Sequence, residues 1–396
     1  MHFILIFNLV KILHVIMQRE PMKWLFYIGI LVFLFFGLFA ENHKDITLHE
    51  GVGYVNLENA KQKFFKLYDT SEVTVKIPNY KNSIVFNAWM RKYLVQKELL
   101  KSTDTLVDTL YYTAIKKFQR SRGLNPDGLI GPKTFAALKI PGKVLYQKII
   151  INMQRWRADR QPDSCFILIN IPSFTLSVIN KNKIDLTFKV IVGKPTWKTP
   201  VIFSKVNTVI VNPYWYVPHN IAIRELIFDI KKDRDYLRKN NFKLLNSKNQ
   251  VVDYRHIDWA RVDASNFNYL LRQEPGADNA LGVVKFLFPS PYSIYMHDTP
   301  AKTLFENEYR ALSHGCIRLE KPMELVDYLA RNGFLPIGID SVECLIEKQK
   351  NYRVLLKKLM PIYVGYFTCE ADFEGNLFFY NDVYKKDEGL VKLLFE

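Results

Sequence analysis

Cys316 and its neighbours are the residues of this chain best suited to covalent chemistry. The cysteine lies in the segment Ser313-His314-Gly315-Cys316-Ile317-Arg318. A thiol attacks a carbonyl carbon as its thiolate, which needs a nearby imidazole, and a small neighbour such as Gly315 leaves room for substrate. Two histidines are candidates for that base: His297, in the segment Tyr295-Met296-His297-Asp298-Thr299-Pro300, and His314 itself.

Short strands must position these two candidates. The flanks Ser293–Met296 and Ile317–Leu319 alternate in a strand-like way, which predicts that His297 and Cys316 lie at the ends of neighbouring strands. The alternative is an inert buried cysteine and a structural histidine, because sequence alone cannot show that the two are close in space. A zinc site is disfavoured because no second pair of closely spaced ligands follows. We expect neither a metal nor a cofactor.

The residues around Cys316 and His297 resemble the L,D-transpeptidase family, cysteine enzymes that remodel bacterial peptidoglycan. That family carries a histidine and, after a loop, a serine or threonine, a variable residue and Gly-Cys-apolar-Arg or Asn. The resemblance extends upstream through Asn279–Gly282, Lys285-Phe286 and Val211–Pro218, and covers about residues 75 to 391. It implies that Cys316 is the nucleophile and His297 the general base and acid.

The same resemblance assigns roles to the flanking residues. Gly315 and the amide of Cys316 are expected to hold the developing oxyanion. Arg318, one strand step beyond Cys316 on the same side, is expected to bind a stem-peptide carboxylate through paired hydrogen bonds, and a purely structural packing role is the alternative. In the family a backbone carbonyl orients the base, so Asp298 need not act as a triad acid, and His314 ranks second as base. The substrate is further expected to contact four flanking residues: Tyr295, Thr299, Ser313 and His314.

The implied reaction is a transfer between peptidoglycan stem peptides. Cys316 would attack the third residue of a donor stem, release D-alanine and leave a thioester, which an amine of a second stem would take up as a cross-link. Two alternatives stay open: an L,D-carboxypeptidase, in which water takes the thioester, and a non-catalytic wall-binding protein. The segment 221–273, polar and helical in pattern, is expected to be a lid insertion, which would favour an amine acceptor.

A helical module precedes the catalytic part. Residues 114–138 resemble the peptidoglycan-binding module of wall hydrolases, a three-helix unit that we place at 80–142. Helices are predicted over Ser83–Leu100 and from Thr109 to Gly123, and Pro132 is predicted to open a third. A helical bundle that serves only packing is the alternative reading of this module.

Strand-like runs broken by turn residues fill the segment from Cys165 to Val211, as is typical of a β-sandwich. We place the catalytic domain at 152–391. The predicted fold class is therefore α+β and multidomain, with a mainly β-sandwich L,D-transpeptidase domain and a small helical peptidoglycan-binding-like domain.

The N-terminal stretch predicts export. Residues 24–40 carry no charge and follow Arg19 and Lys23. As a helix they would span about 25 Å, slightly less than a hydrocarbon core of roughly 30 Å, so a cleavable signal and an inner-membrane anchor both fit residues 1–40. Residues 1–21 form a separate apolar run that a start at Met22 would exclude. Residues 41–79 read as a linker and adaptor.

The composition agrees with the expectation of an extracytoplasmic, periplasmic enzyme that acts on the cell wall. The 396 residues carry 55 Lys and Arg against 39 Asp and Glu, a formal charge of +16. Such a surface favours anionic wall or membrane partners, and no nucleic-acid motif accompanies it. The expected partners are peptidoglycan stem peptides and glycan. The four cysteines indicate no disulfide framework.

Overall fold

A computed structural model describes residues 52–68, 76–81, 83–102, 108–158 and 164–396. The expectations for residues 1–40, the signal or anchor over 24–40 included, lie outside the described residues. Two compact units are distinguished, residues 1–49 and 50–396, and only the second is described below. None of the described helices combines the length and the hydropathy that crossing a membrane requires.

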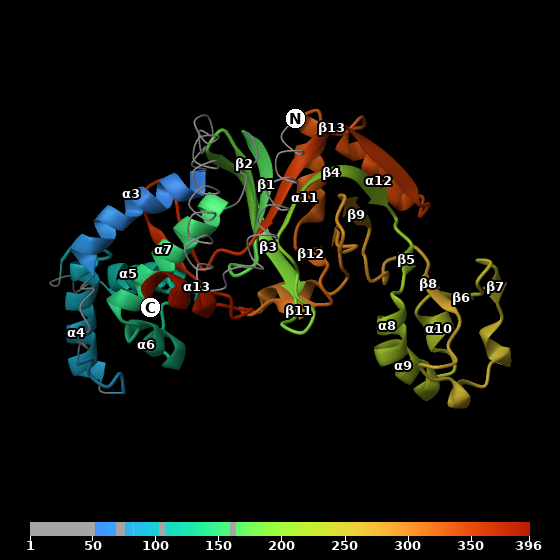
Figure 1. The fold of residues 1–396 in the computed structure, drawn as a ribbon, viewed down its shortest axis with the longest axis horizontal. Coiled ribbons are helices and arrows are strands. Elements are labelled where there is room, and N and C mark those ends of the chain that lie inside the picture. The colour runs from blue at the N-terminus through green and yellow to red at the C-terminus, as the bar shows by residue number, and fades with distance from the viewer. Residues whose placement is uncertain (1–51, 69–75, 82, 103–107, 159–163) are drawn as a thin grey trace, which may run out of the picture. The chain divides into compact units, whose positions relative to one another are not determined.

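The N-terminal part of the second unit is helical (Figure 1). Its elements are α3 (Val52–Leu67), α4 (Ser83–Gln96), α5 (Asp108–Ser121), α6 (Pro132–Leu138) and α7 (Gly142–Ala158). The helices α4, α5 and α6 enclose one apolar core that includes Phe86, Met90 and Phe118. The helix predicted to begin at Pro132 is confirmed, with the proline in the first turn, where its missing N–H is not needed.

The turn between α5 and α6 is held by one buried amide. The side chain of Gln119 donates hydrogen bonds to the Asp127 carboxylate at 2.8 Å and to the carbonyl of Leu129 at 2.9 Å, and accepts one from the N–H of Gly128 at 2.8 Å. A buried amide with its groups satisfied in this way fixes the loop against the helix.

A nine-stranded mixed sheet forms the centre of the catalytic part, in the order β11-β3-β12-β10-β9-β4-β13-β1-β2. Its strands are β1 (Cys165–Asn170), β2 (Thr175–Asn180), β3 (Lys183–Gly193), β4 (Ile202–Val211), β9 (Val284–Leu287), β10 (Met296–His297), β11 (Ala311–Ser313), β12 (Ile317–Leu319) and β13 (Tyr352–Gly365).

The β-sandwich that we expected is instead one sheet that closes on itself. The strand β3 is long enough to have two partners in succession: Lys183 to Lys189 pair with β2, and Val190 and Ile191 pair with β12. The outermost strand β2 is thereby joined to the strand beside β12, which leaves the ring without a break. Pairing between strands so distant in sequence is not visible in their alternation, which is the same in a sandwich and in a barrel.

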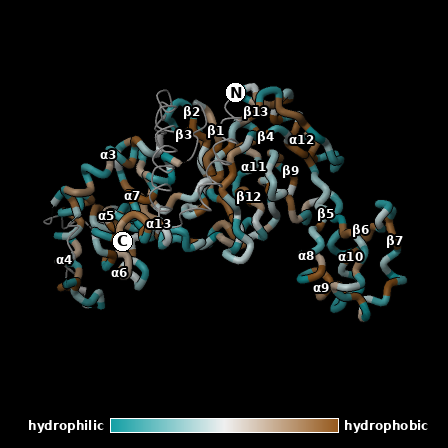
Figure 2. The backbone as a smooth tube through the Cα atoms, viewed as in Figure 1, coloured by the Kyte–Doolittle hydropathy of each residue, from teal (hydrophilic) through white to brown (hydrophobic). Residues whose placement is uncertain are grey.

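The closed sheet surrounds the main apolar core. The helices α11 (Pro322–Arg331) and α12 (Ile339–Glu347) contribute to that core through Leu325, Leu329 and Val342. A second core lies between α7 and the outer side of the sheet, where Trp156 stacks on Phe367 with ring centroids 3.9 Å apart. The strand β1 is therefore buried on both faces, which explains its unbroken apolar sequence (Figure 2).

The segment 221–273 lies within a small α/β unit that has its own apolar core. Four short strands in the order β5-β8-β6-β7 accompany the helices, so the helical expectation for this segment was incomplete. The elements are β5 (Trp215–Tyr216), α8 (His219–Ile221), a π-helical turn (Ala222–Leu226), α9 (Ile227–Lys232), α10 (Tyr236–Lys239), β6 (Phe242–Leu245), β7 (Val251–Val252) and β8 (Leu270–Gln273).

The C-terminal tail returns to the helical part. After β13 it forms a hairpin of β14 (Cys369–Ala371) and β15 (Leu377–Phe379) and ends in α13 (Asp387–Phe395). All four cysteines are free thiols, with Cys369 buried and Cys344 exposed.

Candidate active site

Cys316 and His297 lie on adjacent parallel strands, as their flanks predicted. The pairing joins Met296 to Ile317 and His297 to Arg318. Met296 and Ile317 are buried in the main core. Because side chains alternate along a strand, His297, Cys316 and Arg318 project from the opposite face of the sheet.

Gly315 shapes the turn that presents Cys316. Its φ of +114° is a conformation that residues with a side chain rarely adopt, and a Cβ there would lie 3.2 Å from Ile294. The hydroxyl of Ser313 closes the turn from inside: it donates to the carbonyl of Cys316 at 2.5 Å and accepts from the N–H of Gly315 at 3.1 Å. Within the described part of the chain, the N–H of Cys316 makes no hydrogen bond and is the amide left to bind an oxyanion.

The imidazole of His297 is buried and held in one tautomer. Its Nδ1 lies 2.5 Å from the carbonyl oxygen of Asp298. A carbonyl only accepts, so Nδ1 carries the proton and Nε2 is the basic nitrogen. Burial, followed by the positive charge of Arg318, lowers the pKa of His297 to about 3. The ring is therefore neutral near pH 7 and able to accept a proton.

The carboxylate of Asp298 is engaged elsewhere. It accepts from the Nζ of Lys302 at 2.6 Å and from the N–H of Val283 at 3.0 Å. Asp298 therefore orients His297 through its main chain and anchors the strand end through its side chain.

Lys285 belongs to a segment that carries the family resemblance, but it was not predicted as a site residue. It pairs with His297 across β9 and β10, and its Nζ lies 3.6 Å from the centre of the Tyr295 ring. Burial raises the pKa of the Cys316 thiol, whereas hydrogen bonding by Tyr295 and the positive charge of Lys285 oppose that rise. The signal in the sequence was alternation: Lys285 interrupts an apolar strand on the face that carries His297.

Arg318 also lies in this cluster. Its Nε is buried and has no hydrogen-bond partner among the described residues, and burial lowers the pKa of its guanidinium. Tyr295 has its ring centroid 5.7 Å from that of His297, and burial raises its pKa. The cluster on this face thus holds one thiol, one neutral imidazole and two cations, a setting that stabilises negative charge on sulfur or on a bound carboxylate.

His314 does not face the nucleophile as a second base. Its Nε2 lies 2.6 Å from the Glu225 carboxylate, on the π-helical turn of the segment 221–273, and its ring packs edge-on against Trp197 at 5.3 Å. The guanidinium of Arg224 lies 5.6 Å from the same Trp197 ring. The expected lid segment therefore contacts the turn that carries Cys316.

Thr299 and Ser313 are both buried, and their hydroxyls are occupied by local contacts. The hydroxyl of Thr299 accepts from the N–H of Ala301 at 3.3 Å. No described contact joins Thr299 to Cys316. These two residues hold the loops, whereas Tyr295 and Arg318 lie close enough to the thiol to influence its pKa.

Comparison with known proteins gives two matches along the chain. Residues 165–343 match the L,D-transpeptidase catalytic domain, and residues 88–138 match the family described as "Putative peptidoglycan binding domain". The described site lies inside the first match.

One curated relative is a "Putative L,D-transpeptidase" of Haemophilus influenzae, 35% identical over 243 residues, which are 61% of this chain. The chain thus spans about half the length of that relative, 48%.

Among solved structures, an L,D-transpeptidase from Stackebrandtia nassauensis is 12% identical, with a TM-score of 0.26, over 75% of this chain and 96% of that one. One from Mycobacterium smegmatis is 14% identical, with a TM-score of 0.20, over 51% and 58%. TM-scores this low support no argument about fold or function. Along the sequence, residues 165–343 are thus similar to the L,D-transpeptidase catalytic domain, and residues 88–138 are similar to a putative peptidoglycan binding domain.

Proposed function

We propose that this protein is a peptidoglycan L,D-transpeptidase that acts outside the cytoplasm on stem peptides of the wall. The observation that carries the proposal is the neutral His297, fixed by the Asp298 carbonyl one strand away from Cys316. With Nδ1 held by this carbonyl, Nε2 is the nitrogen that presents a lone pair as the acceptor for the thiol proton, which is what a cysteine acyltransferase needs.

In the proposed reaction, the proton of the thiol passes to His297 and then to the leaving group. The sulfur of Cys316 attacks the carbonyl carbon of the third stem residue while its proton passes to Nε2 of His297. The oxyanion is held by the N–H of Cys316, an interaction commonly worth about 3 to 4 kcal/mol. The tetrahedral intermediate collapses to a thioester, and D-alanine leaves with the proton from His297. The amine of a second stem then attacks the thioester and frees the thiol.

The cations of the cluster have a separate task in this proposal. Arg318 would bind a stem-peptide carboxylate through paired hydrogen bonds, and Lys285 would favour the thiolate. The contact of Glu225 with His314 supports a lid that excludes water from the thioester, and so supports cross-linking over hydrolysis.

The test is to incubate the full chain with purified disaccharide tetrapeptide and to read the products by mass spectrometry. We expect a cross-linked dimer and free D-alanine from the wild type. Cys316→Ala should give neither product, and His297→Asn should be slower by roughly a hundredfold or more. Tripeptide without dimer would replace the proposal by an L,D-carboxypeptidase, and an unchanged tetrapeptide would leave a wall-binding protein.

A further inference from the structure

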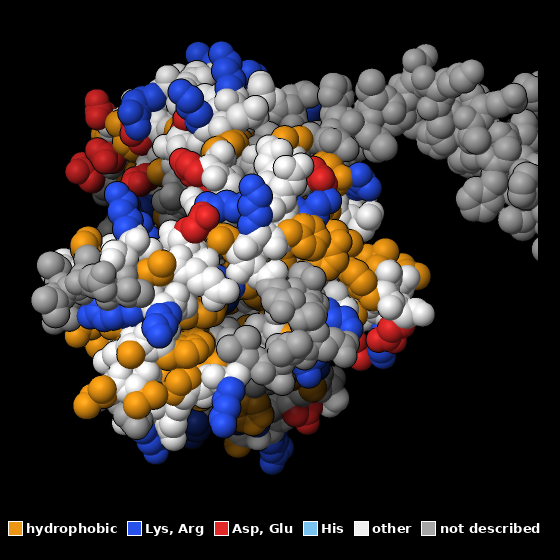
Figure 3. Space-filling model, turned by 90° about the vertical axis from the view of Figure 1, so that its left-hand side faces the viewer, with side chains coloured by type: hydrophobic (Ala, Val, Ile, Leu, Met, Phe, Trp, Pro, Cys, Tyr) orange, Lys and Arg blue, Asp and Glu red, His pale blue; other side chains and the backbone are white. Residues whose placement is uncertain are grey.

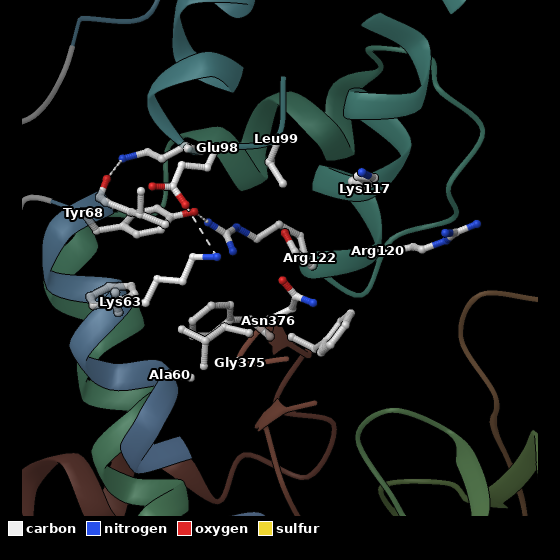
Figure 4. A pocket seen from close by; sticks show the side chains of 17 residues that line it. Ala60, Lys63, Tyr68, Glu98, Leu99, Lys117, Arg120, Arg122, Gly375 and Asn376 are labelled. Atoms are coloured by element: carbon white, nitrogen blue, oxygen red, sulfur yellow. Dashed lines mark hydrogen bonds and ion pairs between the residues drawn. The ribbon is translucent and has the colours of Figure 1, made fainter. Parts of the chain in front are cut away.

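A cavity of about 300 Å³ lies where three segments distant in sequence meet, and no residue of the active site lines it. Its walls come from α3, from the chain around the end of α4 and the end of α5, and from the tip of the β14–β15 hairpin (Figure 4). This volume is at the lower end of the range for small-ligand sites.

Polar side chains converge on this cavity from all three segments. In Figure 4, Lys63, Arg122 and Asn376 point into it, whereas Arg120 points away. The guanidinium of Arg122 donates to the hydroxyl of Tyr68 at 2.9 Å. The face of the molecule that carries the helical part shows Lys and Arg side chains interspersed with hydrophobic ones (Figure 3).

Arg122 is a buried cation without a counter-ion. Only 7% of the residue is exposed, and no described carboxylate lies within ion-pair distance of it. Its Nε makes no hydrogen bond, and the rings of Phe118 and Phe379 lie 5.2 Å and 5.0 Å from the guanidinium. Tyr68 accepts a hydrogen bond from this guanidinium but brings no negative charge, so a buried cation that lacks a carboxylate partner at a cavity wall is suited to an anionic occupant.

The other residues that line the cavity bear on which kind of anion it could bind. Glu98 lies 3.5 Å from Lys63, but the lining also holds Lys97, Lys117 and Arg120, so positive charge predominates around the cavity. The planar fork of a guanidinium matches a carboxylate, and the apolar walls, which include Phe64 and Leu99, suit an aliphatic side chain.

We propose that this cavity binds the free carboxylate end of a short peptide, with Arg122 and Lys63 as its anchors. The identification of that peptide as a wall stem peptide rests on the proposed function. The cavity would then hold one stem on the helical part of the chain, apart from the stem that reacts at Cys316.

The test uses the full chain carrying Cys316→Ala and a disaccharide tripeptide, which lacks the D-alanine to be released. Binding is measured by calorimetry, and a photoreactive form of the same tripeptide locates the contact by mass spectrometry. Cross-links are expected on residues 60–68, 97–99, 117–122 and 375–379. Arg122→Gln should weaken this binding by roughly tenfold or more, and Lys63→Gln by a smaller factor.

Arg120→Gln is the matched control, since it removes a cation two residues before Arg122 whose side chain points away from the cavity, although Arg120 borders its wall. Thermal unfolding shows whether Arg122→Gln still folds, and the half-exposed Lys63 supplies a variant that does not depend on that result. Equal binding by the Arg122→Gln and Arg120→Gln variants, cross-links confined to other segments, or binding of inorganic phosphate alone would each overturn the proposal.

Turnover of tetrapeptide by the wild type is a separate readout. Tripeptide binding at this cavity without turnover would overturn the proposed function and keep the cavity. Turnover without binding at the cavity would overturn the cavity proposal and leave the proposed function standing.

Discussion

The protonation state of His297 follows from where its ring lies. An imidazole with 5% exposure and two cations nearby has little to gain from a third positive charge. Its pKa of about 3 in the folded protein lies well below the value near 6.5 expected in an unfolded chain.

This difference predicts a pH dependence of stability. Between pH 6.5 and 3 the unfolded chain binds a proton that the folded protein does not, so the free energy of unfolding falls as the pH falls through that window. From pH 7 to pH 5 His297 should account for a loss of about 2 kcal/mol. Urea unfolding of wild type and His297→Asn at both pH values measures it. Equal losses in the two proteins would contradict the prediction.

At the same scale, the sequence predicted Cys316 and His297 because residue type and alternation are local properties. The sequence did not predict Lys285 as a site residue, because its position beside His297 depends on the register of β9 against β10. It also ranked His314 as a rival base, because nothing near His314 in the sequence points to Glu225, 89 residues away.

At the scale of elements, the small unit that contains 221–273 meets the catalytic turn through very few side chains. The contact of Glu225 with His314 joins the π-helical turn to the residue two positions before the nucleophile. Such a contact sets how often the unit opens, because α9 follows directly on that turn.

We therefore expect Glu225→Gln to speed hydrogen exchange of the amides in α9. Glu225 is about half exposed, so the contact is worth at most roughly 1 kcal/mol and the increase should not exceed about fivefold. Asp229→Asn is the matched control, since it removes a like charge from α9 itself. The same exchange rates in both variants would show that the contact does not hold the unit.

The elements that the sequence predicted best are those with local signals. The boundaries of α5 and α6 are marked by Gly123 after the first helix and by Pro132 at the start of the second. A turn that ends at Gly128 lies between them, and none of these signals depends on the rest of the chain. The tail from Pro361 to Asp382 alternates in sequence as a hairpin does, but Pro361 to Gly365 belong to a strand of the central sheet. The apolar alternation of these residues is compatible with pairing in a hairpin or in the central sheet.

At the scale of the whole molecule, the formal charge of +16 bears on how the protein meets its substrate. An excess of cations attracts an anionic polymer at a distance, and salt screens that attraction. Raising the salt from about 50 mM to about 300 mM shortens the screening length from roughly 14 Å to roughly 6 Å.

We expect retention of the protein on isolated peptidoglycan to fall severalfold over this range of salt. A pull-down followed by quantification of the unbound fraction measures it, and thermal unfolding at both salt concentrations checks that the fold is unchanged. Retention that does not respond to salt would show that the net charge plays no part in wall binding.

The closed sheet was the feature of the whole molecule that the sequence could not supply. It depends on β3 meeting both β2 and β12, and on β13 lying between β1 and β4. Each of these pairings joins segments whose own sequences are compatible with several neighbours.

Because β13 follows Cys316 and His297 in the sequence, the sheet can close only after these two residues have been synthesised. A ribosome delivers Cys316 and His297 before it delivers Tyr352–Gly365, so the reactive thiol exists for a time on a chain whose sheet is still open between β1 and β4. Because β13 completes the sheet that holds both strands of the site, we expect the arrangement of His297 and Cys316 to become fixed only after this strand is inserted.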